Sequence, residues 1–155
     1  MRSKLHRRQY RPDAPAPLAG VRVVDLSRLV AGNMTSHLLA DFGAEVIKVE
    51  DPHRGDDLRD WKVDGVSTYW KVYSRSKKSL ALGYRTEAGL AVVRKLIADA
   101  DVLIENFLPG KLERLGLAPE ALLASNRGSL FCACPAGARR VRREASRGSA
   151  RSSRR

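Results

Sequence analysis

The sequence has few of the residues that hold together small secreted domains or metal sites. It contains two cysteines in 155 residues, Cys132 and Cys134, which lie one residue apart. With no third or fourth cysteine, a disulfide framework and a zinc site are both unsupported. Charges also break every apolar run well short of the roughly 20 residues that a membrane span requires. We therefore expect no membrane span and a reducing compartment: the cytoplasm, or in a eukaryote the mitochondrial matrix as the alternative.

Nucleotide-binding loops are absent as well. No G-x-G-x-x-G and no G-x-x-x-x-G-K-[ST] motif follows any strand-like run, so neither a dinucleotide site nor a triphosphate P-loop is supported. No internal repeat period is visible either. The composition, 43% apolar and 30% charged, is that of a soluble globular protein with one domain.

Positive charge is abundant, but it lies at the two ends. The net charge is +12; residues 1–12 hold five basic residues and no acid, and residues 132–155 hold eight arginines and one glutamate. The stretch 13–131 is neutral, with sixteen basic and sixteen acidic residues. Polybasic ends bind phosphate polymers non-specifically, so a basic nucleic-acid-binding module is the alternative class of function. Because the middle is neutral, nucleic acid is not the expected partner.

Between Gly20 and Cys134, short β-rich runs alternate with helical patterns. Strands are expected at 21–26, 44–50, 80–84, 101–106 and 129–134. Helices are expected at 34–43, from Thr86 through Ile97, and at 119–125, with helix slightly favoured over strand at 67–79. The charged segment 51–65 is expected to be a surface loop. This order predicts an α/β fold with a mostly parallel sheet.

Several residues in this pattern receive structural interpretations. Leu38, Leu39 and Phe42 share one side of the helix predicted at 34–43. With no visible partner, the aspartates are expected to be caps, turn formers or solvated charges. They are Asp25, Asp41, Asp56, Asp57 and Asp60. Lys77 and Lys78 precede a predicted strand, where solvent exposure and the steering of a phosphate are equally well supported.

The chain divides into three parts by composition. Residues 1–16 form a basic, proline-containing extension, and residues 17–134 form the α/β portion. Residues 135–155 contain almost only Arg, Ala, Ser and Gly, and such a sequence cannot build a core. This tail is either naturally disordered or a stretch outside the reading frame, and the second interpretation is favoured because the last strand should lead into further α/β chain.

The run "DVLIENFLPGKLERLGL" at 101–117 contains the clearest candidate binding residues. Ligands of open parallel sheets bind beyond the carboxyl ends of the strands, where Asn106 and Phe107 stand. An amide can bind a carbonyl or purine edge, a ring can stack, and Arg114 in the following helix can reach a phosphate. Coenzyme A has a flat base, phosphates and an amide-containing arm, and would use all three.

This run, together with "PLAGVRVVDLSRLVAGNMTSHLLADFGAEVIKVEDP", "GDDLRDW", "STYW" and "SRSKKSLALGY", resembles the N-terminal portion of the family III CoA-transferases. The resemblance covers roughly residues 17–134 and is nearest to the succinyl-CoA:glutarate CoA-transferase-like members. It implies a Rossmann-like, truncated α/β fold and a transferase that moves CoA between an acyl-CoA and a carboxylic acid. An acyl-CoA racemase, which works by proton transfer, shares this N-terminal pattern and is the alternative within the family.

The resemblance also implies the site. The CoA-binding residues carried over to this sequence are Val30, Ala31, Leu82, Arg85, Asn106, Phe107 and Arg114. Departures at Val30 and Asn33 leave the acyl preference open, and Asp51 stands where relatives commonly have a basic residue, for which Arg54 is a candidate substitute. The aspartate nucleophile of the family lies beyond the matching region, so no catalytic residue is assigned and this chain alone is expected to be inactive. No permanent cofactor is expected, and a homodimer is implied for the full-length protein.

Overall fold

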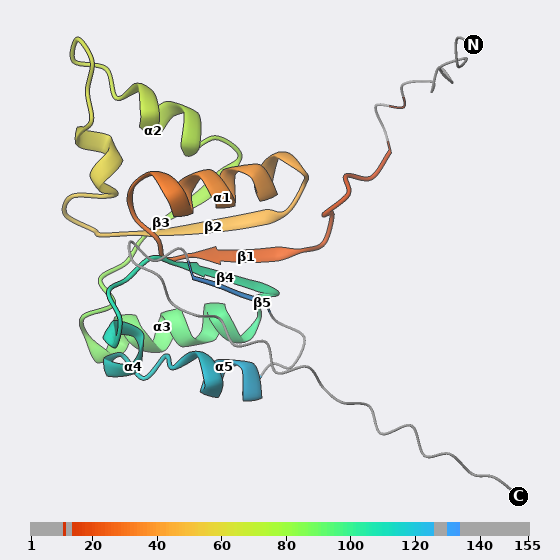
Figure 1. Cartoon of the computed structure of the whole chain (residues 1–155), viewed down its shortest axis with the longest axis vertical. Helices are drawn as coiled ribbons and strands as arrows, with labels where there is room; N and C mark the ends of the chain where they lie inside the picture. Colours follow the sequence, from red (N-terminus) through yellow and green to blue (C-terminus); the bar gives the residue numbers. More distant parts are fainter. Residues whose placement is uncertain (1–10, 12–13, 126–129, 134–155) are drawn as a thin grey trace, which may run out of the picture.

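The computed structural model describes residues 11, 14–125 and 130–133, which form helices on both faces of a parallel sheet (Figure 1). The sheet has five strands in the order β3-β2-β1-β4-β5. Each pair of neighbouring strands is parallel. This is a doubly wound arrangement, in which the chain builds outward from the centre in both directions. The predicted Rossmann-like α/β fold is confirmed.

The strands are close to their predicted places, with one exception. Their bounds are β1 Arg22–Asp25, β2 Glu45–Glu50, β3 Lys77–Ala81, β4 Val102–Glu105 and β5 Leu130–Ala133. At the centre of the sheet, Val24 of β1 pairs with Ile47 of β2 and with Leu103 of β4. Strands covered on both faces need apolar side chains on both, which explains the continuous Val and Ile runs.

Helices cover the two faces separately (Figure 1). On one face lie α1 Leu29–Asp41 and α2 Thr68–Tyr73, preceded by the 3-10 helix η1 Asp57–Asp60. On the other lie α3 Glu87–Ala98, α4 Lys111–Arg114 and α5 Pro119–Ser125. Helix α3 is as predicted: the Thr86 hydroxyl accepts a hydrogen bond from the Gly89 N–H at 3.2 Å, and Leu90, Val93 and Ile97 are buried.

Helix α1 begins five residues earlier than predicted, at Leu29 instead of residue 34. Gly32 and Asn33 are weak helix formers, which is why the pattern placed the start after them. A Cβ atom at Gly32 would lie 2.0 Å from the Ser27 Oγ, so glycine is needed where the helix passes this close to the end of β1. The Asn33 side-chain amide donates to the Leu29 carbonyl at 2.7 Å. Tertiary contacts therefore override local propensity here.

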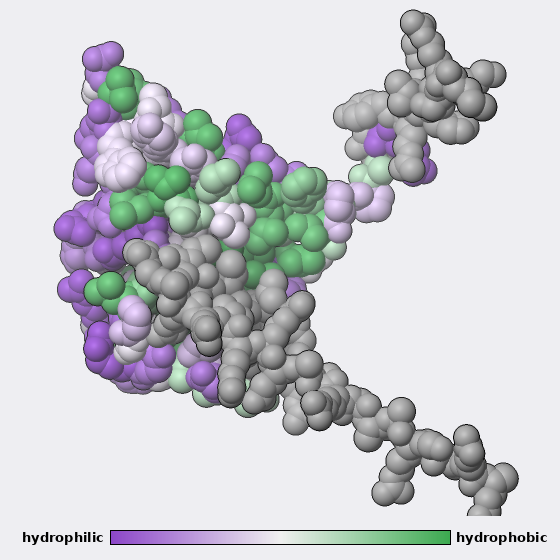
Figure 2. Space-filling view, in the orientation of Figure 1, coloured by the Kyte–Doolittle hydropathy of each residue, from purple (hydrophilic) through white to green (hydrophobic). Residues whose placement is uncertain are grey.

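The apolar side of α1 faces solvent in the described part of the chain. Met34, Leu38 and Phe42 follow one another at i, i+4 and i+8 and are 46%, 47% and 55% exposed. Apolar side chains gather over α1 in Figure 2. The buried residues of the helix are Gly32, Asn33, Ser36, His37 and Ala40. Of the predicted apolar side, Leu38 and Phe42 are exposed while Leu39 packs against the core, so most of the contact with the sheet comes from small and polar residues.

Two polar segments are more ordered than predicted. Strand β3 begins at Lys77, three residues before its predicted start, because Lys77 pairs with Val46 of β2 despite its charge. The 67–79 segment is accordingly helix only in its first half. The segment 51–65, expected to be a surface loop, contains η1 and buries both Asp56 and Leu58.

No helix in the part of the chain that the structure describes is long and apolar enough to cross a membrane. The predicted tail 135–155 lies wholly outside the described residues, and the extension 1–16 lies mostly outside them. The division of the chain into an extension, an α/β portion and a tail therefore stays a prediction.

Candidate functional site

The candidate site lies along the side of the sheet that is formed by the carboxyl ends of its strands. From β1 the chain turns into α1, and from β4 it continues toward α5 on the opposite face, so β1 and β4 flank a topological switch point. We call the segments that follow β1, β3 and β4 at this edge, residues 26–31, 82–86 and 106–114, the switch edge. All residues carried over from the family resemblance lie on it: Val30, Ala31, Leu82, Arg85, Asn106, Phe107 and Arg114.

Asn106 joins two segments of the switch edge. Its Oδ1 accepts a hydrogen bond from the Arg28 backbone N–H at 2.8 Å, and its Nδ2 donates to the Arg28 carbonyl at 2.6 Å. This reciprocal pair fixes the turn after β1 against the end of β4, across the switch point. The amide oxygen expected to meet a ligand is therefore engaged with the protein backbone, which gives Asn106 a role in shaping the edge.

Phe107 is part of the core rather than an open platform. Its side chain is largely buried, and its N–H donates to the Glu105 Oε2 at 2.7 Å. The Tyr84 ring lies 6.1 Å away between centroids, and the Lys111 ammonium lies 4.1 Å from the Phe107 ring centroid, a cation–π contact. The ring that was expected to stack on a base is thus covered by Lys111, and it holds that ammonium at the switch edge.

Four cations gather at the switch edge, and we call them the cation cluster: Arg28, Arg85, Lys111 and Arg114. Partial burial, together with repulsion from the three guanidinium groups, holds the pKa of Lys111 below its usual value. Of these four, Arg28 alone has a carboxylate of a described residue within ion-pair distance, Asp57 at 3.8 Å. Four like charges held together with one ion-paired carboxylate among them leave an excess of positive charge, which attracts a polyanion.

The other carried-over residues frame the cluster. Val30 and Ala31 follow Leu29 in the first turn of α1, and the first is half-buried and the second exposed. Leu82 is half-buried against the core, and its N–H donates to the Glu50 carbonyl at 2.9 Å. The structure therefore brings Arg85 and Arg114 together in the cluster and places Val30 and Ala31 beside it.

The acid at Asp51 is held by its own turn. Hydrogen bonds from the backbone N–H groups of His53, at 2.9 Å, and Arg54, at 3.2 Å, lower the pKa of the Asp51 carboxyl. The Arg54 side chain, the expected substitute for a basic residue at position 51, pairs instead with Asp57 at 3.3 Å. Within the described residues, the positive charge of the edge thus comes from the cation cluster and not from this turn.

A network of buried charges lies beneath the turn from β1 into α1. Asp25 of β1 is fully buried and lies 3.5 Å from the Lys48 Nζ and 3.6 Å from the Lys77 Nζ. Both lysine side chains are 2% exposed. Lys48 also donates to the Ser27 carbonyl, and Lys77 donates to the Ser36 hydroxyl at 2.6 Å. Asp25 does act in a turn, since its Oδ1 accepts a hydrogen bond from the Ser27 N–H at 2.9 Å, but the solvated alternative is wrong because the side chain is buried in ion pairs. Lys77 is neither solvent-exposed nor at the ligand edge.

Lys77 should make stability depend on pH. Burial, only partly offset by Asp25, lowers the pKa of Lys77 from 10.5 to about 8. A lysine with a lower pKa in the folded than in the unfolded chain disfavours folding while it is protonated, and this penalty shrinks as the pH rises from about 8 toward the unfolded pKa of 10.5. Between pH 7.5 and pH 9.5, we expect the free energy of unfolding of the wild-type chain to rise by up to about 2 kcal/mol more than that of the Lys77→Met variant. Urea denaturation at the two pH values measures this difference, and parallel curves for the two proteins would contradict it.

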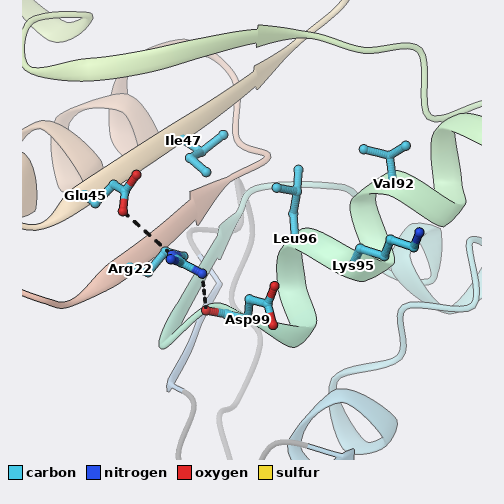
Figure 3. A pocket seen from close by; sticks show the side chains of 7 residues that line it. All are labelled: Arg22, Glu45, Ile47, Val92, Lys95, Leu96 and Asp99. Carbon is cyan, nitrogen blue, oxygen red and sulfur yellow. Dashed lines mark hydrogen bonds and ion pairs between the residues drawn. The ribbon is translucent and has the colours of Figure 1, made fainter.

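A shallow pocket lies at the other edge of the sheet, where β1 and β2 begin (Figure 3). Ile47, Val92 and Leu96 form its apolar wall between β2 and α3. Arg22 points into it, but its guanidinium is engaged with Glu45 at 3.7 Å and with the Asp99 carbonyl at 3.4 Å. None of the residues carried over from the family resemblance lines this pocket.

The fold and the switch edge together define an α/β protein whose sheet carries an anion-attracting site at its switch point. Residues 18–136 match the model of CoA-transferase family III. The chain therefore belongs to CoA-transferase family III, as the resemblance predicted.

The relatives that this chain is similar to are longer than it is. It is 47% identical over 120 residues to a succinyl-CoA–D-citramalate CoA-transferase from Chloroflexus aurantiacus, covering 76% of this chain and 30% of that protein. It is 46% identical over 111 residues to the mouse succinyl-CoA:glutarate CoA-transferase, covering 70% and 26%. A CAIB/BAIF family protein from Brucella suis has a similar structure, with a TM-score of 0.71 and 42% identity over 77% of this chain and 33% of that one. The chain thus spans about a third or less of these relatives.

Sequence reasoning missed three features of the site. Arg28 and Tyr84 also stand at the switch edge, and the position of each just after a strand was the available signal. Lys111 was not assigned to the site. The buried partners of Asp25 gave no signal, because Lys48 and Lys77 lie 23 and 52 positions further along the chain.

Proposed function

We propose that this chain forms the CoA-binding part of an enzyme that transfers CoA between an acyl-CoA and a carboxylic acid. The observation that carries the proposal is the cation cluster, in which Arg85, Lys111 and Arg114 have no carboxylate partner among the described residues. Family membership supplies the ligand class, and the cluster supplies a place for its phosphates at the switch point.

Each part of CoA has a candidate partner on the switch edge. The guanidinium groups of Arg85 and Arg114 and the Lys111 ammonium are suited to the phosphates. The first turn of α1, with Val30 and Ala31, would line the thioester end, and Leu82 offers an apolar contact. Asn106 and Phe107 would support the site without contacting the ligand. Asn106 fixes the Arg28 backbone, and Phe107 holds the Lys111 ammonium.

The chemistry follows from the family resemblance. An aspartate carboxylate attacks the thioester carbonyl, CoA leaves as its thiolate, and a mixed anhydride forms on the enzyme. The thiolate then attacks the aspartyl carbonyl of that anhydride and releases the donor acid. The acceptor carboxylate attacks the resulting aspartyl-CoA thioester, expels the CoA thiolate and forms a second mixed anhydride. The thiolate then attacks the acceptor carbonyl of this anhydride, which releases the new acyl-CoA and the free aspartate. No described residue is assigned as the nucleophile. Because several relatives are named as succinyl-CoA transferases acting on citramalate, glutarate or malate, we propose succinyl-CoA as donor and a dicarboxylic acid as acceptor.

We also propose that the longer protein is a homodimer. The exposed apolar side of α1, formed by Met34, Leu38 and Phe42, supports this, because an apolar patch of this kind marks an interface more often than free surface. The proposed location, the cytoplasm or the mitochondrial matrix, follows from the reducing environment that the cysteine usage favours.

Titration of the full 155-residue chain with CoA tests the proposal. We expect binding that weakens as sodium chloride is raised from 50 to 300 mM, because cations that contact phosphates are screened by salt. Adenosine, which has the base but no phosphates, is the matched control and should bind far more weakly at both salt concentrations. The absence of CoA binding at low salt would contradict the proposed function.

A further inference from the structure

The buried side chain of Asp56 contacts the turn from β1 into α1. Asp56 is not among the residues expected to bind the ligand. Asp56 stands just before η1 and is buried, with 2% of its surface exposed. Burial by itself would raise the pKa of Asp56, but the Lys48 ammonium at 3.1 Å and hydrogen bonds from Leu58 and Asn33 outweigh it and lower the pKa. Asp56 is therefore a fixed, buried carboxylate beneath the switch edge.

Both oxygens of this carboxylate contact the turn above it. Oδ1 accepts a hydrogen bond from the Leu29 N–H at 3.3 Å, and Oδ2 accepts one from the Asn33 side-chain amide at 2.9 Å. The same amide group donates to the Leu29 carbonyl. Leu29 is thus held at its N–H by Asp56 and at its carbonyl by an Asn33 side chain that Asp56 also binds.

Leu29 needs this support because its backbone is strained. Its φ is +61°, in the left-handed region that residues with a side chain avoid. Such a conformation persists when the surrounding structure over-determines it, and it concentrates at functional sites. The strained residue lies directly between Arg28 of the cation cluster and Val30, the first of the two residues proposed to line the thioester end.

We propose that Asp56 is a positioning residue, which holds the turn after β1 in the left-handed conformation that binds the thioester end of an acyl-CoA. The inference rests on the proposed function and adds the residue that sets the geometry of its acyl subsite. Asp56 does not itself touch the ligand; it acts through the Leu29 backbone and through Asn33. The nucleotide end of the ligand is independent of it, since Arg85, Lys111 and Arg114 stand on other segments.

Two ligands distinguish these ends of the site: succinyl-CoA, and 3′-phospho-ADP, which is the nucleotide part of CoA. We expect Asp56→Asn to weaken succinyl-CoA binding about tenfold, equivalent to about 1.4 kcal/mol, and to leave 3′-phospho-ADP binding unchanged. Asp60→Asn, on the exposed side of the same 3-10 helix, is the control and should change neither affinity. Adding Leu29→Gly to Asp56→Asn should restore most of the loss, because glycine adopts a positive φ without strain.

A second pair of variants decides the question if Asp56→Asn does not fold. Leu29 is 37% exposed and outside the core, so substitutions there are compatible with folding. Leu29→Val, which resists a positive φ, should lose succinyl-CoA affinity, whereas Leu29→Gly should keep it. Equal affinities for these two variants, or a loss at Asp56→Asn that is the same for both ligands, would overturn the proposal. A wild-type chain that binds neither ligand would instead refute the proposed function.

Discussion

Lys48→Met is expected to lower the free energy of unfolding by about 3–5 kcal/mol, the usual effect of removing one partner from a buried ion pair. Lys48 is 2% exposed and lies 3.1 Å from Asp56 and 3.5 Å from Asp25. Methionine fills a similar volume, so the loss comes from charge and not from a cavity. Asp25 would keep the Lys77 ammonium at 3.6 Å, whereas Asp56 would lose its ion pair with Lys48 and become a buried carboxylate without a paired ammonium among the described residues.

Urea denaturation monitored by circular dichroism measures this loss. Lys78→Met is the matched control, because that side chain is 70% exposed and its pair with Glu45 lies on the surface, where an ion pair contributes little to stability. The double variant Lys48→Met/Asp56→Asn removes one charge of each sign and should be less destabilised than the sum of the two single variants. Additive losses, or a Lys48→Met variant as stable as Lys78→Met, would show that the buried charges do not act as a network.

Arg114→Ala is expected to weaken CoA binding by about 10- to 150-fold, the range that corresponds to a charge-assisted hydrogen bond of about 1.5–3 kcal/mol. Arg114 stands in α4 beside Lys111 and has no carboxylate partner among the described residues, so no internal ion pair is lost with it. The loss should shrink as salt is raised, because phosphate contacts are screened. The folded state should change little.

Calorimetric titration at 50 and 300 mM salt tests this expectation. Arg22→Ala is the matched control, since that arginine stands at the opposite edge of the sheet in the pocket of Figure 3. It should lower overall net charge by the same amount without changing CoA affinity by more than about twofold, an effect of long-range charge alone. Equal effects of the two substitutions would mean that CoA responds to the charge of the whole chain and not to a site at the switch edge.

Local sequence patterns correctly predicted the elements that bury their apolar side chains in the core. The Val-rich run of β1 and the Leu90, Val93, Ile97 stripe of α3 are placed as expected, because apolar periodicity and burial coincide there. The switch edge was also predictable in outline, since Asn106 and Phe107 follow a strand in a parallel sheet. Their contacts were not, because the partners Arg28 and Tyr84 come from distant segments.

Three further errors occur where charge is buried. The charge of Lys77 led the pattern to place the start of β3 three residues too late. The many charges around Asp56 predicted a surface loop, and no partner for Asp25 could be identified in the sequence. Each was misjudged because a charged side chain is normally solvated, and only a three-dimensional arrangement of two lysines and two aspartates makes their burial tolerable. No local pattern contains that arrangement.

The inverted packing of α1 has a consequence for how the chain reaches its native state. Hydrophobic collapse alone would favour the helix turned about its axis, with Met34, Leu38 and Phe42 against the sheet, so the early driving force and the final structure disagree over this element. In the turned helix, Lys77 would lose the Ser36 hydroxyl and the Asn33 carbonyl, its polar partners on α1. The buried charges therefore select the rotation of α1, because the turned helix would bury more apolar surface but would leave the buried Lys77 ammonium without these two oxygens.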